Sequence, residues 1–261
     1  MKTSEGRTRR PALERLRSRE PVFGVVQIIP APTLTELAIW SGYDFVILDC
    51  QYGVIDEAAQ LASLQVIARS DAFAAVRVRP GDIGSVSRYL DFGADAILLP
   101  DVHTPKDAAA FVAAATHGPQ GTRSSTGSGA RAARYGLVAR SEQVRPLLLA
   151  MIEGAQAVKN IAAIAATPGI DGLIIGPHDL SADLGCVGEF SSAAYLAAFN
   201  AVELEATRAG LILGSGAHPG FGVERLIEAG HCFIQTTSDV LALREGYRAR
   251  LPSSRDNSSQ P

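Results

Sequence analysis

The stretch FVILDCQYG, residues 45–53, decides the fold because it joins an unbroken apolar run to a group of polar side chains. Its first four residues lack the polar alternation of a strand that has one face in water. Such a strand is covered on both faces, as in a parallel sheet wrapped by helices. The polar residues that follow then lie at the carboxyl end of the strand.

The same pattern recurs along the chain. Apolar runs rich in Val, Ile and Leu predict strands over residues 22–28, 45–48, 73–78, 96–99, 147–152, 172–175, 211–214 and 232–235. After a leading helix over 11–17, stretches of helical period alternate with them over 33–40, 57–68, 84–92, 106–115, 155–166, 193–209, 223–229 and 240–250. Eight such units predict a (β/α)8 TIM barrel whose active face is formed by the residues just past each strand.

A doubly wound open sheet is the alternative fold, since it also alternates strand and helix. It usually carries a glycine-rich phosphate turn after the first strand, whereas this chain reads QIIPAP over residues 27–32. We therefore expect a single barrel domain over 21–250, preceded by a tail and leading helix in 1–20 and followed by a disordered tail over 251–261.

Composition favours a compact globular protein with small-molecule partners. The 261 residues are 47% hydrophobic and carry a formal net charge of -3, so no basic face for nucleic acid or anionic lipid is expected. The cysteines are too few and too scattered for a disulfide framework or a Cys-x-x-Cys metal site. The charged first 20 residues lack the apolar core of a signal peptide, and no apolar run is long enough for a membrane span, which predicts a cytoplasmic protein.

Polar residues past successive strands should converge at the mouth of a barrel. Those residues are Asp49, Gln51 and Tyr52 after the second strand, Arg79 after the third, Glu153 after the fifth, GPHDLS (176–181) after the sixth and His218 after the seventh. The long loop over 117–136 is glycine-rich and contains three arginines, which favours a binding loop over a mobile surface loop.

Glu153 and Asp179 follow neighbouring strands, so the two carboxylates can bind one divalent cation, with water and substrate completing an octahedron. Oxygen ligands suit Mg²⁺ or Mn²⁺ better than a His/Cys zinc site. The alternative, equally favoured by spacing, is that both acids stabilise helix N-termini. GPHDLS enters a helix whose free N–H groups favour a substrate carboxylate. Arg79 stabilises an enolate oxygen or forms an ion pair on the rim.

Six motifs carry a family resemblance: GYDFVILDCQYG, VRPGD, LDFGADAILLP, GPQGTR, MIEGAQAVKNI and GIDGLIIGPHDLSADLG. Over roughly residues 21–250 the chain resembles the HpcH/HpaI aldolase and citrate lyase family, metal-dependent class II 2-oxo-acid aldolases with a barrel of the phosphoenolpyruvate/pyruvate-binding type. The resemblance implies that Glu153 and Asp179 hold the metal, with Mg²⁺ or Mn²⁺ favoured and Co²⁺ or Zn²⁺ as alternatives.

The resemblance also assigns roles around the substrate. It implies that Arg79 contacts the 2-oxo oxygen and that Gly176, Pro177 and His178 surround the substrate carboxylate. We expect two further substrate contacts, from Gln51 and from Arg123 in GPQGTR. Asp91, in LDFG, matches an acid near a subunit boundary, and relatives are commonly hexamers, which implies a homo-oligomer.

The sequence departs from the family in the opening stretch. Relatives read Asp-x-Glu-His, where the histidine works with the aspartate as acid and base, whereas this chain reads Asp49-Cys50-Gln51-Tyr52. A tyrosine, with an ordinary pKa of about 10 against about 6.5 for histidine, is a poor base at neutral pH but a good hydrogen-bond donor. Asp49 and Tyr52 are therefore predicted as catalytic residues, with Tyr52 in the place of the family's histidine.

Three functions fit these observations. The leading one is a metal-dependent carbon–carbon lyase or aldolase on a 2-oxo acid, with pyruvate or oxaloacetate as the enolate side. The second is a biosynthetic synthase of the same family, in which Tyr52 positions an acceptor. The third is a non-catalytic homologue that binds 2-oxo acids, which the retention of Arg79, Glu153 and Asp179 disfavours.

Overall fold

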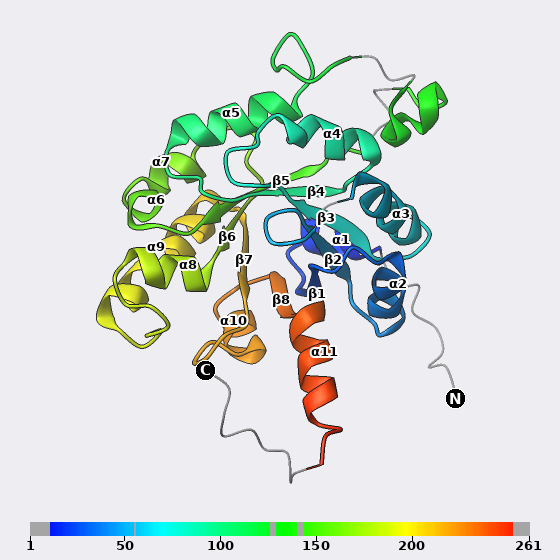
Figure 1. Cartoon of the computed structure of the whole chain (residues 1–261). Helices are drawn as coiled ribbons and strands as arrows, with labels where there is room; N and C mark the ends of the chain where they lie inside the picture. Colours follow the sequence, from blue (N-terminus) through cyan, green and yellow to red (C-terminus); the bar gives the residue numbers. More distant parts are fainter. Residues whose placement is uncertain (1–10, 55, 126–128, 140–143, 253–261) are drawn as a thin grey trace.

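Eight parallel strands close into a barrel in the computed structural model, which describes residues 11–54, 56–125, 129–139 and 144–252 (Figure 1). The strands pair in chain order, and β8 returns to β1. Their bounds are β1 Val22–Gln27, β2 Phe45–Asp49, β3 Phe73–Arg77, β4 Ala96–Leu99, β5 Leu147–Ile152, β6 Gly172–Ile175, β7 Ile212–Gly216 and β8 Phe233–Ser238. The predicted (β/α)8 barrel is confirmed, and the open-sheet alternative is excluded.

Helices surround the barrel between the strands (Figure 1). They are α1 Ala12–Arg17, α2 Pro32–Trp40, α3 Glu57–Ile67, α4 Ser85–Phe92, α5 Pro105–Ala115, the 3-10 helix η2 Arg131–Gly136, α6 Ala155–Lys159, α7 Ile161–Ala165, α8 Pro177–Asp183, α9 Ala193–Ala209, α10 Val223–Glu228 and α11 Asp239–Arg248. The single helix predicted over 155–166 is two short ones, because Asn160 leaves helical geometry at φ −99° and ψ 6°.

Side-chain alternation along the strands divides the core into two layers. Residues of one parity fill the barrel interior, where Phe45 stacks on Phe73 and Phe233 at centroid distances of 5.2 and 4.1 Å. A Cβ at Gly24 would lie 2.0 Å from the Phe45 ring, so only glycine fits there. Residues of the other parity pack against the helices. The continuous apolar runs in the sequence reflect burial on both faces.

A repeated device ties the strands together where they begin. Three aspartates stand directly before β2, β4 and β6 and each accepts a hydrogen bond from a backbone N–H of the preceding strand: Asp44 from Phe23 at 3.1 Å, Asp95 from Ala74 at 2.9 Å and Asp171 from Leu148 at 2.8 Å. Cys232 takes the same place before β8 and lies 3.7 Å from the Leu213 carbonyl. This end of the barrel therefore stabilises the fold and leaves the opposite end for chemistry.

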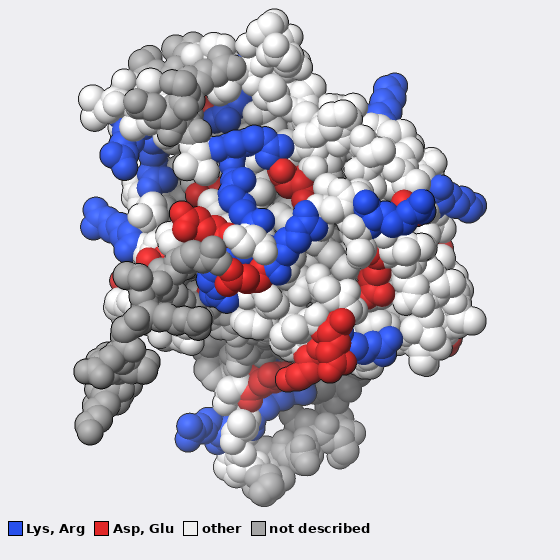
Figure 2. Space-filling view, turned by 180° about the vertical axis from the view of Figure 1, so that it is seen from behind, with Lys and Arg blue, Asp and Glu red and all other residues white. Residues whose placement is uncertain are grey.

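Charges of both signs are interspersed over the face seen in Figure 2. Arginine pairs with acid at several places on the described surface, as in Arg145 with Asp171 at 2.6 Å and Arg88 with Glu57 at 2.7 Å. Within the described ranges, no helix is both long and apolar enough to cross a membrane. Of the tails predicted within 1–20 and over 251–261, residues 1–10 and 253–261 lie outside the part of the chain that the structure describes.

Candidate functional site

An ion pair joins the carboxyl ends of β2 and β3. The Nε and Nη2 groups of Arg77 donate to the two carboxylate oxygens of Asp49, each at 2.8 Å. The backbone N–H groups of Gln51 and Tyr52 also donate to this carboxylate, at 2.9 and 3.4 Å. Because the Asp49 side chain is fully buried and Arg77 is 13% exposed, the pair is rigid and shielded from solvent. Asp49 therefore fixes the direction of the Arg77 guanidinium.

Arg77 is a candidate site residue that the sequence analysis missed. Its side chain has the parity of Phe73 and Ala75, which fill the barrel interior, so it points to the mouth. Arg79 lies past the strand with an exposed side chain, and its Nε donates to the Cys50 carbonyl at 3.3 Å. Arg79, for which the enolate contact is predicted, thus has a rim position in this structure. Because Arg77 and Arg79 share the same strand parity, only the pairing with Asp49 shows that Arg77 is the one held at the mouth.

Glu153 is held at the end of β5 with one oxygen bonded and one free. It is buried, and its Oε2 accepts a hydrogen bond from the Asp101 backbone N–H at 3.1 Å. Asp101, which donates this hydrogen bond, has a left-handed backbone conformation with φ 55°. Glu153 Oε1 has no hydrogen-bond partner among the described residues. A buried carboxylate oxygen without a partner is costly, which indicates that a ligand is its natural partner.

Gly176 and Asp179 place α8 beside this free oxygen. A Cβ at Gly176 would lie 2.5 Å from Glu153 Oε1, so glycine at the end of β6 makes room for the carboxylate. Asp179, in the first turn of α8, is exposed at the mouth. Burial, together with the charges of Asp179 and Asp101, raises the pKa of Glu153 to about 7, although the Asp101 N–H lowers it. The two carboxylates are therefore close enough to repel each other.

The donor set fits a divalent cation with an open coordination sphere. Glu153 and Asp179 offer carboxylate oxygens, and the described residues contain no group of three or more His, Cys, Asp or Glu placed to enclose a metal. Two carboxylates leave positions for water and a chelating substrate, which suits a hard cation such as Mg²⁺. The free Oε1 and the mutual repulsion are both relieved by a cation.

Tyr52 lies over the Asp49 and Arg77 pair. The Arg77 guanidinium carbon is 5.2 Å from the centroid of the Tyr52 ring, and Tyr52 is 60% exposed. Partial burial and the charges of Asp179, Glu153 and Asp49 raise the pKa of the Tyr52 phenol, against the lowering effect of Arg77. The phenol therefore stays protonated at neutral pH, as a hydrogen-bond donor.

Other predicted site residues have mixed placements. Gly176 caps α8, and His178 is exposed with its edge against Phe190 at 5.3 Å. Gln51 Oε1 is buried and has no partner among the described residues. His218 is occupied, since its ring nitrogens contact the Gly216 carbonyl at 2.7 Å and the Tyr195 hydroxyl at 2.8 Å. Substrate contacts by Gly176, Pro177, His178 and Gln51 stay predictions.

Arg123 and Asp91 pair with each other, away from the mouth of their own barrel. Arg123 Nη2 donates to Asp91 at 2.6 Å, and the Arg123 side chain is 7% exposed. Asp91 ends α4 and Arg123 follows α5, so both lie near the end where the strands begin. Within one chain, the structure does not bring Arg123 to Glu153. Arg123 and Asp91 therefore neutralise each other within the chain. They are 32 residues apart in the sequence, so the sequence pattern does not reveal this contact.

The fold and this site define an enzyme of the barrel class, with carboxylates and an arginine at the carboxyl ends of its strands. The chain belongs to the HpcH/HpaI aldolase/citrate lyase family, whose model matches residues 29–245. This family comprises aldolases and citrate lyases that act on 2-oxo acids, and the protein is a carbon–carbon lyase of the aldolase type.

Similar proteins support this membership. A hydroxypyruvate/pyruvate aldolase from Sagittula stellata is 32% identical, over 90% of this chain and 94% of its own. A solved member of the family from Burkholderia cenocepacia J2315 has 29% identity and a TM-score of 0.86, over 94% of this chain and 100% of its own. The citrate lyase β subunit of M. tuberculosis, solved with oxaloacetate and magnesium, is 18% identical with a TM-score of 0.55. The match covers 90% of this chain and 99% of that chain, and it shows similarity of fold alone.

Proposed function

We propose that the protein is a divalent-metal-dependent lyase or aldolase that forms the enolate of pyruvate from oxaloacetate or from a 4-hydroxy-2-oxo acid. The observation that carries the proposal is the free, buried Oε1 of Glu153, which lies against Gly176 and close to Asp179. The relative named hydroxypyruvate/pyruvate aldolase supports the substrate class.

Glu153 and Asp179 would hold the cation, with Mg²⁺ or Mn²⁺ favoured by the oxygen donors. When bound, the cation polarises the 2-oxo carbonyl and stabilises negative charge on its oxygen. Arg77 donates to that same oxygen, because Asp49 holds its guanidinium at the mouth through two hydrogen bonds. At the start of α8, Gly176 donates its N–H to the Ile152 carbonyl at 3.2 Å and Pro177 has no N–H, so the His178 N–H and the helix dipole bind the substrate carboxylate.

The bond changes explain which groups the reaction needs. In oxaloacetate, the C3–C4 bond breaks, its electron pair forms the enolate, CO₂ leaves and C3 then takes a proton. No hydroxyl has to lose a proton in this reaction. In aldol cleavage the C4 hydroxyl must lose its proton as the same bond breaks, which requires a base. The protonated Tyr52 therefore favours decarboxylation over aldol cleavage.

The proposal is tested by incubating the protein with Mg²⁺ or Mn²⁺ and each substrate class. We expect pyruvate release from oxaloacetate, abolished by a chelator and restored by either cation, and slower release from 4-hydroxy-2-oxo acids. Released pyruvate is measured by coupled reduction to lactate. Release from oxaloacetate at the rate of the metal ion alone, without protein, would contradict the proposal.

A synthase running toward carbon–carbon bond formation is the second candidate, and the raised pKa of Tyr52 favours it. In this direction the acceptor carbonyl gains a proton, which a phenol can donate. Tyr52→His should restore a base and raise the aldol cleavage rate by about tenfold or more, within the range of general-base catalysis. Unchanged cleavage with unchanged oxaloacetate decarboxylation would show that Tyr52 does not tune the acid and base chemistry.

Two further proposals rest on the family and on composition. A homo-oligomer, a hexamer by resemblance, is supported by large apolar side chains exposed on α2 and α11, such as Trp40 at 76% and Tyr247 at 70%. Asp91 at a subunit boundary belongs to this proposal. A cytoplasmic location is likewise proposed, since the three cysteines are free and buried.

A further inference from the structure

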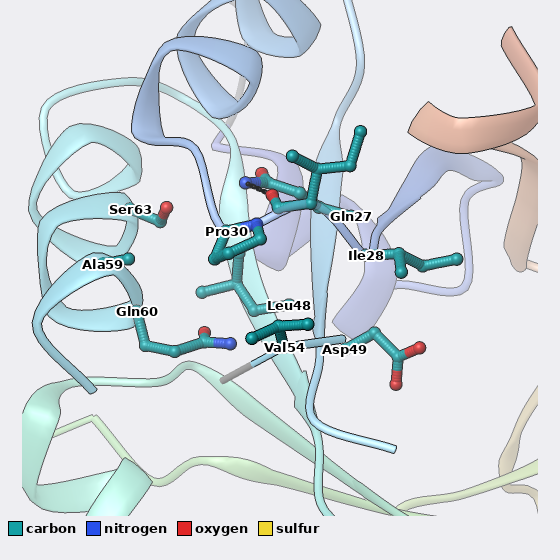
Figure 3. A pocket seen from close by; sticks show the side chains of 10 residues that line it. Gln27, Ile28, Pro30, Leu48, Asp49, Val54, Ala59, Gln60 and Ser63 are labelled. Carbon is teal, nitrogen blue, oxygen red and sulfur yellow. Dashed lines mark hydrogen bonds between the residues drawn. The ribbon is translucent and has the colours of Figure 1, made fainter. Parts of the chain in front are cut away.

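The two buried carboxylates at the barrel mouth differ in how many of their oxygens are engaged. Asp49 lines a small hollow beside α3, but its carboxylate points away from that helix (Figure 3), and Arg77 donates to both of its oxygens at 2.8 Å. In Glu153, Oε2 accepts from the Asp101 backbone N–H at 3.1 Å, whereas Oε1 has no hydrogen-bond partner within the described ranges. Glu153 therefore presents one free oxygen, and Asp101 holds the other.

Asp101 donates this hydrogen bond from a left-handed backbone conformation, with φ 55°. Its side chain is exposed, so the conformation determines the direction of the N–H group. For most residues with a Cβ this region is unfavourable, and asparagine and aspartate enter it most readily after glycine. The residue type at position 101 thus matches the backbone geometry that the contact with Glu153 requires.

The turn that carries Asp101 is anchored next to α5. Val102 is fully buried. The backbone N–H groups of His103 and Thr104 donate to Asp107 Oδ2 at 3.2 and 2.8 Å, and Thr104 and Asp107 form the capping box that begins α5. Because β4 and this helix cap hold the two ends of a short turn, the Asp101 N–H keeps its direction without a ligand.

Gly176 confines the free oxygen of Glu153. A Cβ at Gly176 would lie 2.5 Å from Glu153 Oε1 and 2.6 Å from its Cγ, so the glycine backbone packs directly against the carboxylate. The Gly176 N–H donates to the Ile152 carbonyl at 3.2 Å, which ties this backbone to β5. The Glu153 carboxylate is therefore held by a hydrogen-bond donor and by a backbone wall. Loss of a contact that orients a metal ligand typically lowers metal affinity by about 10- to 100-fold.

We propose that Asp101 is a positioning residue for the cation site: its left-handed backbone holds Glu153 Oε2, so that Glu153 offers only Oε1 to the cation. The other coordination positions are then left to Asp179, water and substrate. The inference rests on the proposed function, because that function assigns Glu153 to the metal. Asp101 contributes its backbone, so residues that readily adopt the left-handed region should replace it.

The test compares Asp101→Val with Asp101→Asn, because both variants remove the charge and only asparagine readily adopts the left-handed conformation. Mn²⁺ affinity, measured by water-proton relaxation, should be about tenfold weaker in Asp101→Val than in Asp101→Asn. Asp101→Gly should match Asp101→Asn, since glycine enters the same region. Tight Mn²⁺ binding by the wild type with equal affinities in Asp101→Val and Asp101→Asn would overturn the inference and leave the proposed function standing.

Arg19 provides the matched control for backbone strain. It is also exposed and left-handed, with φ 61°, and it lies at the opposite end of the barrel, where its Nη1 donates to the Leu211 carbonyl at 3.0 Å. Arg19→Val should melt at a lower temperature than Arg19→Asn, yet the two should bind Mn²⁺ equally. A loss of Mn²⁺ affinity in Arg19→Val as large as that in Asp101→Val would mean that general destabilisation causes the effect, and the inference would fail.

A measurement on the metal-free protein separates failure of this inference from failure of the proposed function. Hydrogen exchange followed by NMR should show the Asp101 amide exchanging about tenfold or more slowly in the wild type than in Glu153→Ala, which lacks the acceptor. Equal exchange in the two proteins would overturn the inference even where the wild type binds Mn²⁺. A protected Asp101 amide in a wild type that binds no Mn²⁺ would instead count against the proposed metal site and not against the contact between Asp101 and Glu153.

Discussion

Arg77→Met should lower kcat for pyruvate release from oxaloacetate by about a hundredfold or more. The guanidinium is fixed at the mouth by two hydrogen bonds from its Nε and Nη2 groups to Asp49, so its donors meet the enolate oxygen without reorganisation. Methionine keeps much of the side-chain volume and removes every donor. The measurement is the steady-state rate at saturating Mg²⁺, since Arg77 acts on charge that develops in the transition state.

Two companion variants separate this role from others. Arg79→Met is the matched control: its side chain is exposed on the rim, and its loss should change kcat less than about threefold, as for a surface substitution. Arg77→Lys keeps the charge but loses the fork that Asp49 holds, so an intermediate rate is expected. If Arg79→Met lost activity and Arg77→Met kept it, the original sequence-based assignment would be right and Arg77 would serve only the fold.

Arg77→Met also has a structural cost that the experiment must measure. Removing Arg77 leaves the buried Asp49 carboxylate with only the backbone donors of Gln51 and Tyr52, a loss of about 3 kcal/mol of unfolding free energy. Thermal melting of each variant should show this. Kinetics are therefore compared at a temperature at which the variant remains folded.

Glu153→Gln should reduce metal-dependent turnover by about a hundredfold or more, because a neutral amide replaces one of two charged ligands. Glutamine has the same shape, so the tight approach to Gly176 and the hydrogen bond from Asp101 are both kept. Asp183→Asn, at the far end of α8, is the matched control, since Asp183 accepts from the Ala155 N–H and stands one helical turn from Asp179. Full activity in Glu153→Gln would contradict the metal role.

The same substitution makes a prediction about stability without metal. The pKa of Glu153 is raised from 4.5 to about 7, so the folded state holds a proton that the unfolded state releases between these values. The Glu153 carboxyl therefore lowers the free energy of unfolding as the pH rises from 4.5 to about 7, and this loss is complete above pH 7. Glu153→Gln should raise the melting temperature of the metal-free protein at pH 8 and leave it unchanged near pH 4.5.

Two results would argue against this account of Glu153. If the melting temperature of Glu153→Gln rose equally at all pH values, the charged Glu153 carboxylate would not be destabilised by burial and by Asp179. A loss of stability at pH 8 would mean that its charge is paired in the metal-free fold. Addition of Mg²⁺ should reverse the order at pH 8, since only the wild type gains binding energy from the cation.

The strands were predictable from sequence because burial on both faces is a local property of composition. Phe45 to Leu48 and Leu147 to Ile152 are apolar throughout, and the barrel follows from eight such runs. The neighbours of each strand end were also predictable, since parallel strands place their carboxyl ends together. Glu153 and Asp179 were therefore found as a pair.

Contacts between distant side chains could not be predicted in the same way. Arg77 and Arg79 are chemically alike and two residues apart, and only the pairing with Asp49 shows which one is held at the mouth. Arg123 pairs with Asp91, a contact that the sequence did not predict, and its substrate contact stays a prediction.

The most direct test of the central claim is a Mn²⁺ titration followed by water-proton relaxation, with and without oxalate, a planar analogue of the pyruvate enolate. We predict one tight Mn²⁺ site per chain in the wild type, fewer metal-bound waters when oxalate is added, and loss of the site in both Glu153→Gln and Asp179→Asn. Identical Mn²⁺ binding by the wild type and by these two variants would contradict the claim that Glu153 and Asp179 form the metal site.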